Sequence, residues 1–137
     1  MQRYRKSVRN YVKHGGRPVC VFCERESNEV LEETQSCYVM RSNFAYDLWE
    51  FRDVLEHLLI APKRHVESLL ELTPEERADI MEIAARYEAD HYDIYARGVA
   101  SITRTVPKHQ HTHLIKSADK PSKLAVYVTK PHFLFKV

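Results

Sequence analysis

Three histidines occupy alternate positions in the stretch KHQHTHLIK: His109, His111 and His113. Successive side chains of a β-strand point to opposite faces, so these three would share one face. A row of imidazoles can bind a metal ion, because neutral imidazole is a common metal ligand. It can also act on phosphoryl groups, with one ring attacking phosphorus and others donating hydrogen bonds. The apolar neighbours Leu114 and Ile115 make the alternative, an ordinary solvent-facing row, the weaker interpretation.

A second candidate site is the cysteine pair of the sequence CVFC, Cys20 and Cys23. Two thiolates at this spacing can bind one zinc ion from a tight turn, but they need two further ligands. A redox pair is the alternative, although redox motifs of this kind usually open a helix in a βαβ unit. The remaining zinc ligands would have to be histidines, which the chain offers at positions 57, 65 and 109 to 113. The third cysteine, Cys37, is expected as a small buried residue of another strand.

The 137 residues fit one domain with a single hydrophobic core. A net charge of +2 argues against nucleic acid as the partner. No apolar run is long enough to span a bilayer, and no apolar signal segment follows the basic start. We therefore expect a cytoplasmic protein without membrane contact, whose thiols stay reduced.

The first residues of the chain are basic and contain no acidic residue. We predict a basic helical arm over residues 1–16, followed by a single domain over residues 17–137. Such an arm can contact an anionic surface or the acidic side of another subunit, or it can simply be a solvated helix face.

The clearest local signal is the sequence LTPEER, which predicts the start of a long helix. Thr73 is placed as the N-cap, Pro74 as the first helical residue, and Glu76 as the third helical residue, which completes a capping box with Thr73. We predict that this helix continues to about Arg97, with Gly98 directly after its end.

The remaining elements are predicted to be strands separated by loops. Residues 24–35 are expected as a loop and residues 43–54 as irregular, with strands at 36–42, 56–62, 100–106, 109–116, 124–128 and 132–137. One long helix between early and late strands is typical of an α+β domain with a mostly antiparallel sheet.

Taken together, the motifs resemble the histidine triad (HIT) family. Its signature, His-x-His-x-His followed by apolar residues, matches residues 109–115, and its upstream strand matches EHLLIAPKRH at residues 56–65. Zinc-containing members begin with Cys-x-Phe-Cys, which matches Cys20 to Cys23. The resemblance implies an α+β fold with about five antiparallel strands, one long helix and a shorter one, in a homodimer. It also implies cleavage at the α-phosphate of nucleotide conjugates, by nucleoside phosphoramidases, dinucleoside polyphosphate hydrolases or nucleotidyltransferases.

The resemblance assigns roles to individual residues. It implies His111 as the nucleophile, and His113 as a donor to the phosphoryl oxygen or the leaving group. It implies a structural zinc ion held by Cys20, Cys23, His65 and His109. Substrate contacts would come from Ser42 or Asn43, from Thr105, and from His57, which would also support the triad from behind.

Two departures bear on the substrate. Glu56 replaces the glycine usual before the upstream histidine, and the Gly-Gln-Ser type phosphate loop before the triad is absent. The sequence RTVPK stands in its place, where Arg104, Thr105 or Lys108 could supply donors. The missing loop favours an alternative function, a non-catalytic zinc-containing module of the same fold that binds a nucleotide or a partner.

Overall fold

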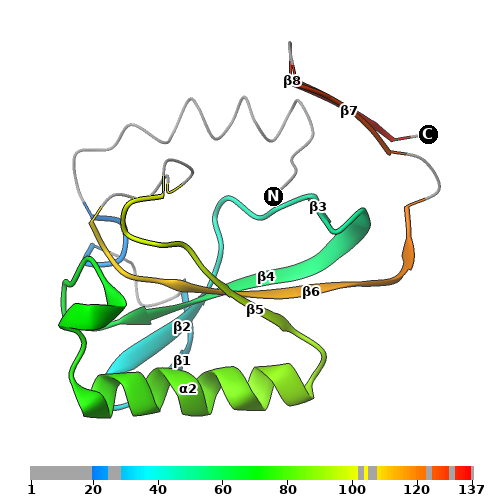
Figure 1. Cartoon of the computed structure of the whole chain (residues 1–137). Helices are drawn as coiled ribbons and strands as arrows, with labels where there is room; N and C mark the ends of the chain where they lie inside the picture. Colours follow the sequence, from blue (N-terminus) through cyan, green and yellow to red (C-terminus); the bar gives the residue numbers. More distant parts are fainter. Residues whose placement is uncertain are drawn as a thin grey trace.

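Figure 1 shows the computed structural model, which describes residues 20–24, 29–101, 104, 108–122, 125–129 and 132–136. The strands of the main sheet are β1 (Val30–Glu33), β2 (Cys37–Arg41), β3 (Leu48–Trp49), β4 (Arg52–Pro62), β5 (Asp93–Ala96) and β6 (Thr112–Pro121). The 3₁₀ helix η2 (Leu69–Glu71) and the helix α2 (Pro74–Ala89) lie between β4 and β5 in the sequence. The predicted arm over residues 1–16, and Thr105, lie outside the described residues.

The strands form one antiparallel sheet in the order β1-β2-β4-β6-β5, with β3 paired to β4. The long strands β4 and β6 form its centre, where Leu59 lies opposite His113 and His57 lies opposite Ile115. The late strands β7 (Ala125–Thr129) and β8 (His132–Lys136) pair with each other as a separate hairpin. The predicted α+β class with an antiparallel sheet is confirmed.

The two faces of the sheet are packed differently. Helix α2 covers one face (Figure 1), and the core there contains Val39, Leu58, Ile60, Leu114, Ile80 and Ile83. A smaller apolar cluster of Phe22, Met40, Leu59 and Ala61 lies on the opposite face. Because side chains alternate along a strand, His57 and His113 share this second face with Leu59. The histidines therefore lie on the side of the sheet turned away from the helix.

Helix α2 begins as predicted. The Thr73 hydroxyl accepts a hydrogen bond from the Glu76 amide at 3.2 Å, and the Glu76 carboxylate accepts one from the Thr73 amide at 2.8 Å. The guanidinium of Arg64 donates to both oxygens of the same carboxylate, at 3.0 Å and 2.7 Å. Within the described part of the chain, no helix has the length and apolar character needed to cross a membrane.

This arrangement predicts a pH-dependent contribution of Glu76 to stability. The Arg64 hydrogen bonds hold the folded-state pKa of the Glu76 carboxyl below its usual value of 4.5. A lowered folded-state pKa stabilises the protein above the unfolded-state pKa, and this stabilisation is lost as pH falls through the folded-state pKa. Urea unfolding should therefore show Glu76→Gln less stable than the parent at pH 7, with the difference shrinking below about pH 4. A difference that is unchanged between pH 7 and pH 3 would contradict this assignment.

The predicted end of the helix is wrong, because α2 has 16 residues and stops at Ala89. His91 adopts a left-handed backbone with φ of 65°. The His91 and Tyr92 amides donate to the carbonyls of Glu88 and Tyr87, both at 3.1 Å. This is a Schellman-type ending, in which histidine takes the position that glycine usually fills. The residues that follow form β5 instead of further helical turns.

Three further expectations are corrected. The predicted loop at residues 24–35 contains β1, and the predicted irregular segment at 43–54 contains β3 and the start of β4. A tight turn joins β3 to β4 through Glu50 and Phe51, both with positive φ. Within the predicted strand at residues 100–106, Ala100, Ser101 and Arg104 belong to turns or irregular backbone, and the rest lies outside the described residues.

Candidate active site and metal site

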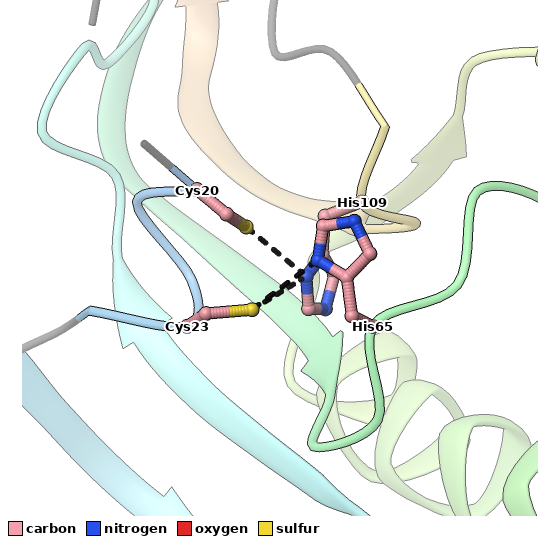
Figure 2. A group of neighbouring side chains, drawn as sticks. All are labelled: Cys20, Cys23, His65 and His109. Atoms are coloured by element: carbon pink, nitrogen blue, oxygen red, sulfur yellow. Dashed lines mark hydrogen bonds between the residues drawn. The ribbon is translucent and has the colours of Figure 1, made fainter. Parts of the chain in front are cut away.

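Two cysteines and two histidines from distant parts of the chain form one cluster: Cys20, Cys23, His65 and His109. Cys20 and Cys23 lie on a tight turn, in which the Cys23 amide donates to the Cys20 carbonyl at 3.1 Å. His65 follows the end of β4, and His109 precedes β6. Figure 2 shows both sulfur atoms and both imidazole rings directed toward one another.

The distances within this cluster fit one tetrahedral metal ion. Sγ of Cys23 lies 3.2 Å from Nδ1 of His65 and 3.7 Å from Nδ1 of His109. Sγ of Cys20 lies 3.3 Å from Nδ1 of His109. Bonds of about 2.3 Å to sulfur and about 2.0 Å to nitrogen place tetrahedral zinc ligands about 3.3–3.8 Å apart. All four ligand atoms lie within 4.8 Å of one another, so the cluster can hold a metal ion.

The surroundings of His109 support the same conclusion. Its Nε2 lies 2.9 Å from the Pro62 carbonyl oxygen, which can only accept, so Nε2 carries the proton. Nδ1, the atom facing the two sulfurs, is therefore the nitrogen that carries the lone pair. A metal-ligating histidine typically donates its other ring N–H to a carbonyl in this way.

The third cysteine differs from this pair. Cys37 is fully buried in β2, as the sequence predicted, and burial raises the pKa of its thiol to about 12. The thiolate form that binds metals or attacks substrates is therefore absent at neutral pH. Cys37 acts as an apolar residue of the core.

Phe22 connects the metal cluster to the middle histidine of the triad. Its side chain is buried, and the ring centroid lies 5.1 Å from the rings of both His109 and His111. The position of the cysteine turn therefore determines one wall around His111.

Hydrogen bonding fixes the tautomer of His111. Its Nδ1 lies 3.0 Å from the His109 carbonyl oxygen, so Nδ1 donates and Nε2 keeps its lone pair. Burial lowers the pKa of His111, and the positive charges of Arg104 and Arg97 act in the same direction. The lowered pKa favours the uncharged ring, whose lone pair lies on Nε2.

Two successive hydrogen bonds fix the tautomer of His113, which differs from the tautomer of His111 in that its Nε2 carries the proton. The Tyr46 amide donates to Nδ1 of His57 at 3.1 Å, so His57 must carry its proton on Nε2. That Nε2 lies 2.8 Å from Nδ1 of His113 and donates to it. Nδ1 of His113 is therefore the acceptor, and the proton of His113 lies on Nε2. His111 thus offers a lone pair at Nε2, whereas His113 offers an N–H.

An aromatic wall lies beside His113, and the sequence alone did not indicate it. The Tyr46 ring is 5.5 Å from the His113 ring, and the Tyr95 ring is 5.8 Å from it. Trp49 packs against both tyrosines, at 6.0 Å and 5.3 Å. Tyr95 lies in β5, Trp49 in β3, and Tyr46 just before β3, so their position next to β6 depends on strand pairing.

The predicted substrate contacts are placed as follows. Ser42 follows β2, and its amide donates to the His57 carbonyl at 2.9 Å. The amide group of Asn43 is exposed and donates to Glu29 at 3.4 Å. Of the two, Ser42 is thus the one tied to the histidine-bearing strand β4.

Comparisons with known proteins identify structures with a similar fold. No protein-family profile matches the sequence. No curated protein matches it at a significant level. Solved structures do match. A hypothetical protein from Leishmania major is 23% identical, with a TM-score of 0.56 and 74% of each chain covered. A HIT family hydrolase from Clostridium thermocellum is 20% identical, with a TM-score of 0.53, covering 79% of this chain and 99% of that one.

A uridylyltransferase structure matches as well. It is 24% identical with a TM-score of 0.51, and the match covers 85% of this chain but 38% of the uridylyltransferase. At these identities the likeness concerns the fold. The chain therefore has a HIT-like fold, as the sequence motifs indicated.

Proposed function

We propose that the protein is a nucleotide-conjugate hydrolase that acts at the α-phosphate through a nucleotidyl-histidine intermediate on His111. The observation that carries this proposal is the complementary protonation of two neighbouring rings. His111 presents a lone pair and His113 presents an N–H, and their ring centroids lie 4.9 Å apart. An attacking nitrogen beside a hydrogen-bond donor is the arrangement that nucleophilic displacement at phosphorus requires.

The reaction proceeds in two displacements. Nε2 of His111 forms a bond to the α-phosphorus, and the bond from phosphorus to the leaving group breaks with its electron pair on the leaving group. The Nε2–H of His113 donates to the phosphoryl oxygen as negative charge develops there. Water then attacks the phosphorus and gives up a proton to the solvent, the bond to His111 breaks with its electron pair returning to Nε2, and nucleoside monophosphate is released.

The proposal includes a structural zinc ion at the Cys20, Cys23, His65 and His109 cluster. Two sulfur and two nitrogen ligands suit zinc, and four protein ligands leave no open position for chemistry. The ion would fix the cysteine turn, and Phe22 with it, against the sheet. We place the protein in the cytoplasm, where thiols stay reduced, as a homodimer like that implied by the HIT resemblance.

The purified protein should release AMP from a dinucleoside polyphosphate or from an adenosine phosphoramidate, with uridine analogues assayed in parallel. Chromatographic detection of the nucleoside monophosphate measures this directly. Turnover should require the intact protein and no added cofactor. Binding of these compounds without any turnover would exclude the hydrolase and support the non-catalytic binding module instead.

A further inference from the structure

The β5–β6 register places Arg97 beside His111, the proposed nucleophile. In the β5–β6 ladder, Tyr95 is opposite His113 and Ala96 is opposite Thr112. Arg97 directly follows β5 and His111 directly precedes β6, so continuing the ladder by one position places the two residues opposite each other. Because side chains alternate, Arg97 points to the same face as Tyr95, which is the face of the histidines.

The guanidinium of Arg97 is held beside the aromatic wall. Its Nη2 donates to the Tyr46 hydroxyl at 3.4 Å, and its Cζ lies 5.3 Å from the centre of the Tyr95 ring. Both tyrosine rings contact the ring of His113. The positive charge of Arg97 is therefore placed on the side of the site where His113 offers its N–H.

A second arginine, Arg104, contacts the segment that holds the start of the histidine triad. Nη2 of Arg104 donates to the carbonyl of Glu67 at 2.7 Å. That segment also contacts the start of the triad, since the Gln110 amide donates to the Val66 carbonyl at 2.7 Å. Arg104 also opens the RTVPK sequence that replaces the missing phosphate loop.

We propose that Arg104 binds the α-phosphate and that Arg97 binds the next phosphate, so that the substrate is a phosphoanhydride with a phosphate leaving group. This inference rests on the proposed function and narrows its substrate class. The guanidinium groups of Arg97 and Arg104 are held by different partners, the Tyr46 hydroxyl and the Glu67 carbonyl. Two such groups suit two successive phosphates, because guanidinium pairs with phosphate oxygens in a bidentate manner.

The protonation of the histidines favours the same leaving group. A second proton on Nδ1 of His113 would collide with the Nε2–H of His57, whose own Nδ1 is occupied by the Tyr46 amide. His113 therefore stays neutral, and giving up its Nε2 proton would leave an imidazolate. It can donate a hydrogen bond but cannot act as an acid. An amine leaving group must take up a proton, whereas a phosphate leaves as a stable anion.

Ligand binding tests this proposal without depending on turnover. The full chain with its metal is titrated with AMP, UMP and the α,β-methylene analogues of ADP and UDP, whose bridging carbon prevents cleavage. Trp49 is the only tryptophan and packs beside Tyr95, so its fluorescence reports binding. For at least one base, the diphosphate analogue should bind about 10-fold or more tightly than the monophosphate, as a charge-assisted contact provides.

Alanine variants distinguish the contributions of Arg97 and Arg104 to ligand affinity. Arg97→Ala should reduce the diphosphate preference to within about 3-fold and leave monophosphate affinity unchanged, whereas Arg97→Lys keeps part of the preference. Arg104→Ala should weaken both ligands alike. Arg77→Ala is the matched control, because Arg77 also donates to a carbonyl, at 3.0 Å from Leu70, but on helix α2.

Equal affinity for monophosphate and diphosphate, no binding of any of the four ligands, or equal losses for both in Arg97→Ala would overturn the inference. A diphosphate preference that depends on Arg97, in a protein that hydrolyses no nucleotide conjugate, would support the phosphate site and reject the hydrolase.

Discussion

The His111→Asn variant should lose turnover of nucleotide conjugates by about 10³- to 10⁶-fold, the range expected for loss of a nucleophile. Asparagine lacks the ring lone pair that Nε2 of His111 presents toward phosphorus. Its size and polarity suit a buried position, so fold, metal content and nucleotide binding should be retained. Steady-state rates of nucleoside monophosphate release measure the loss.

His91→Asn is the matched control for this substitution. His91 is exposed at the end of helix α2, in a left-handed conformation that asparagine also tolerates. This variant should match the parent in rate and stability. A His111→Asn rate within a few-fold of the parent would show that another group makes the first bond to phosphorus.

The second large effect is expected from Cys23→Ser. The parent should contain about one equivalent of zinc, and the variant less than half of one, because serine replaces one of four ligands. Cys23 is exposed, so the substitution removes little packing and any loss of stability reflects the metal. A site saturated about 1,000-fold above its Kd contributes about 4 kcal/mol. The thermal midpoint should therefore fall by at least about 10 °C.

Turnover should fall with the metal in this variant. Without the ion, the cysteine turn no longer holds Phe22 against His111, 5.1 Å from its ring. Cys37→Ala provides the contrast, since it removes a buried thiol from the core but should retain the full zinc content. Equal metal content and equal thermal midpoints in Cys23→Ser and the parent would rule out the proposed site.

The side chains of the site could be predicted from the sequence because each motif is local. The alternating histidines, the cysteine pair and the Pro-Lys-x-His exit from a strand are each readable within ten residues. The structure brings the four predicted metal ligands into one cluster. The start of α2 was also predictable, since the side chains of a capping box lie within four residues.

The missed features depend on unusual residues or on long-range pairing. The end of α2 was missed because His91 occupies the left-handed position where glycine is expected. The β3 hairpin was missed because Glu50 and Phe51 form its turn in place of the usual Asn-Gly. The position of Arg97 beside His111 follows from the β5–β6 register, which no local pattern determines.

The covalent intermediate gives the most direct test of the proposed mechanism. The parent is mixed with excess substrate, quenched within milliseconds at alkaline pH to preserve a phosphorus–nitrogen bond, and analysed by intact and peptide mass spectrometry. We predict one added nucleotidyl group per chain, located on His111 and absent from His111→Asn. Rapid turnover with no adduct on His111, or with the nucleotidyl group on a different residue, would contradict His111 as the nucleophile.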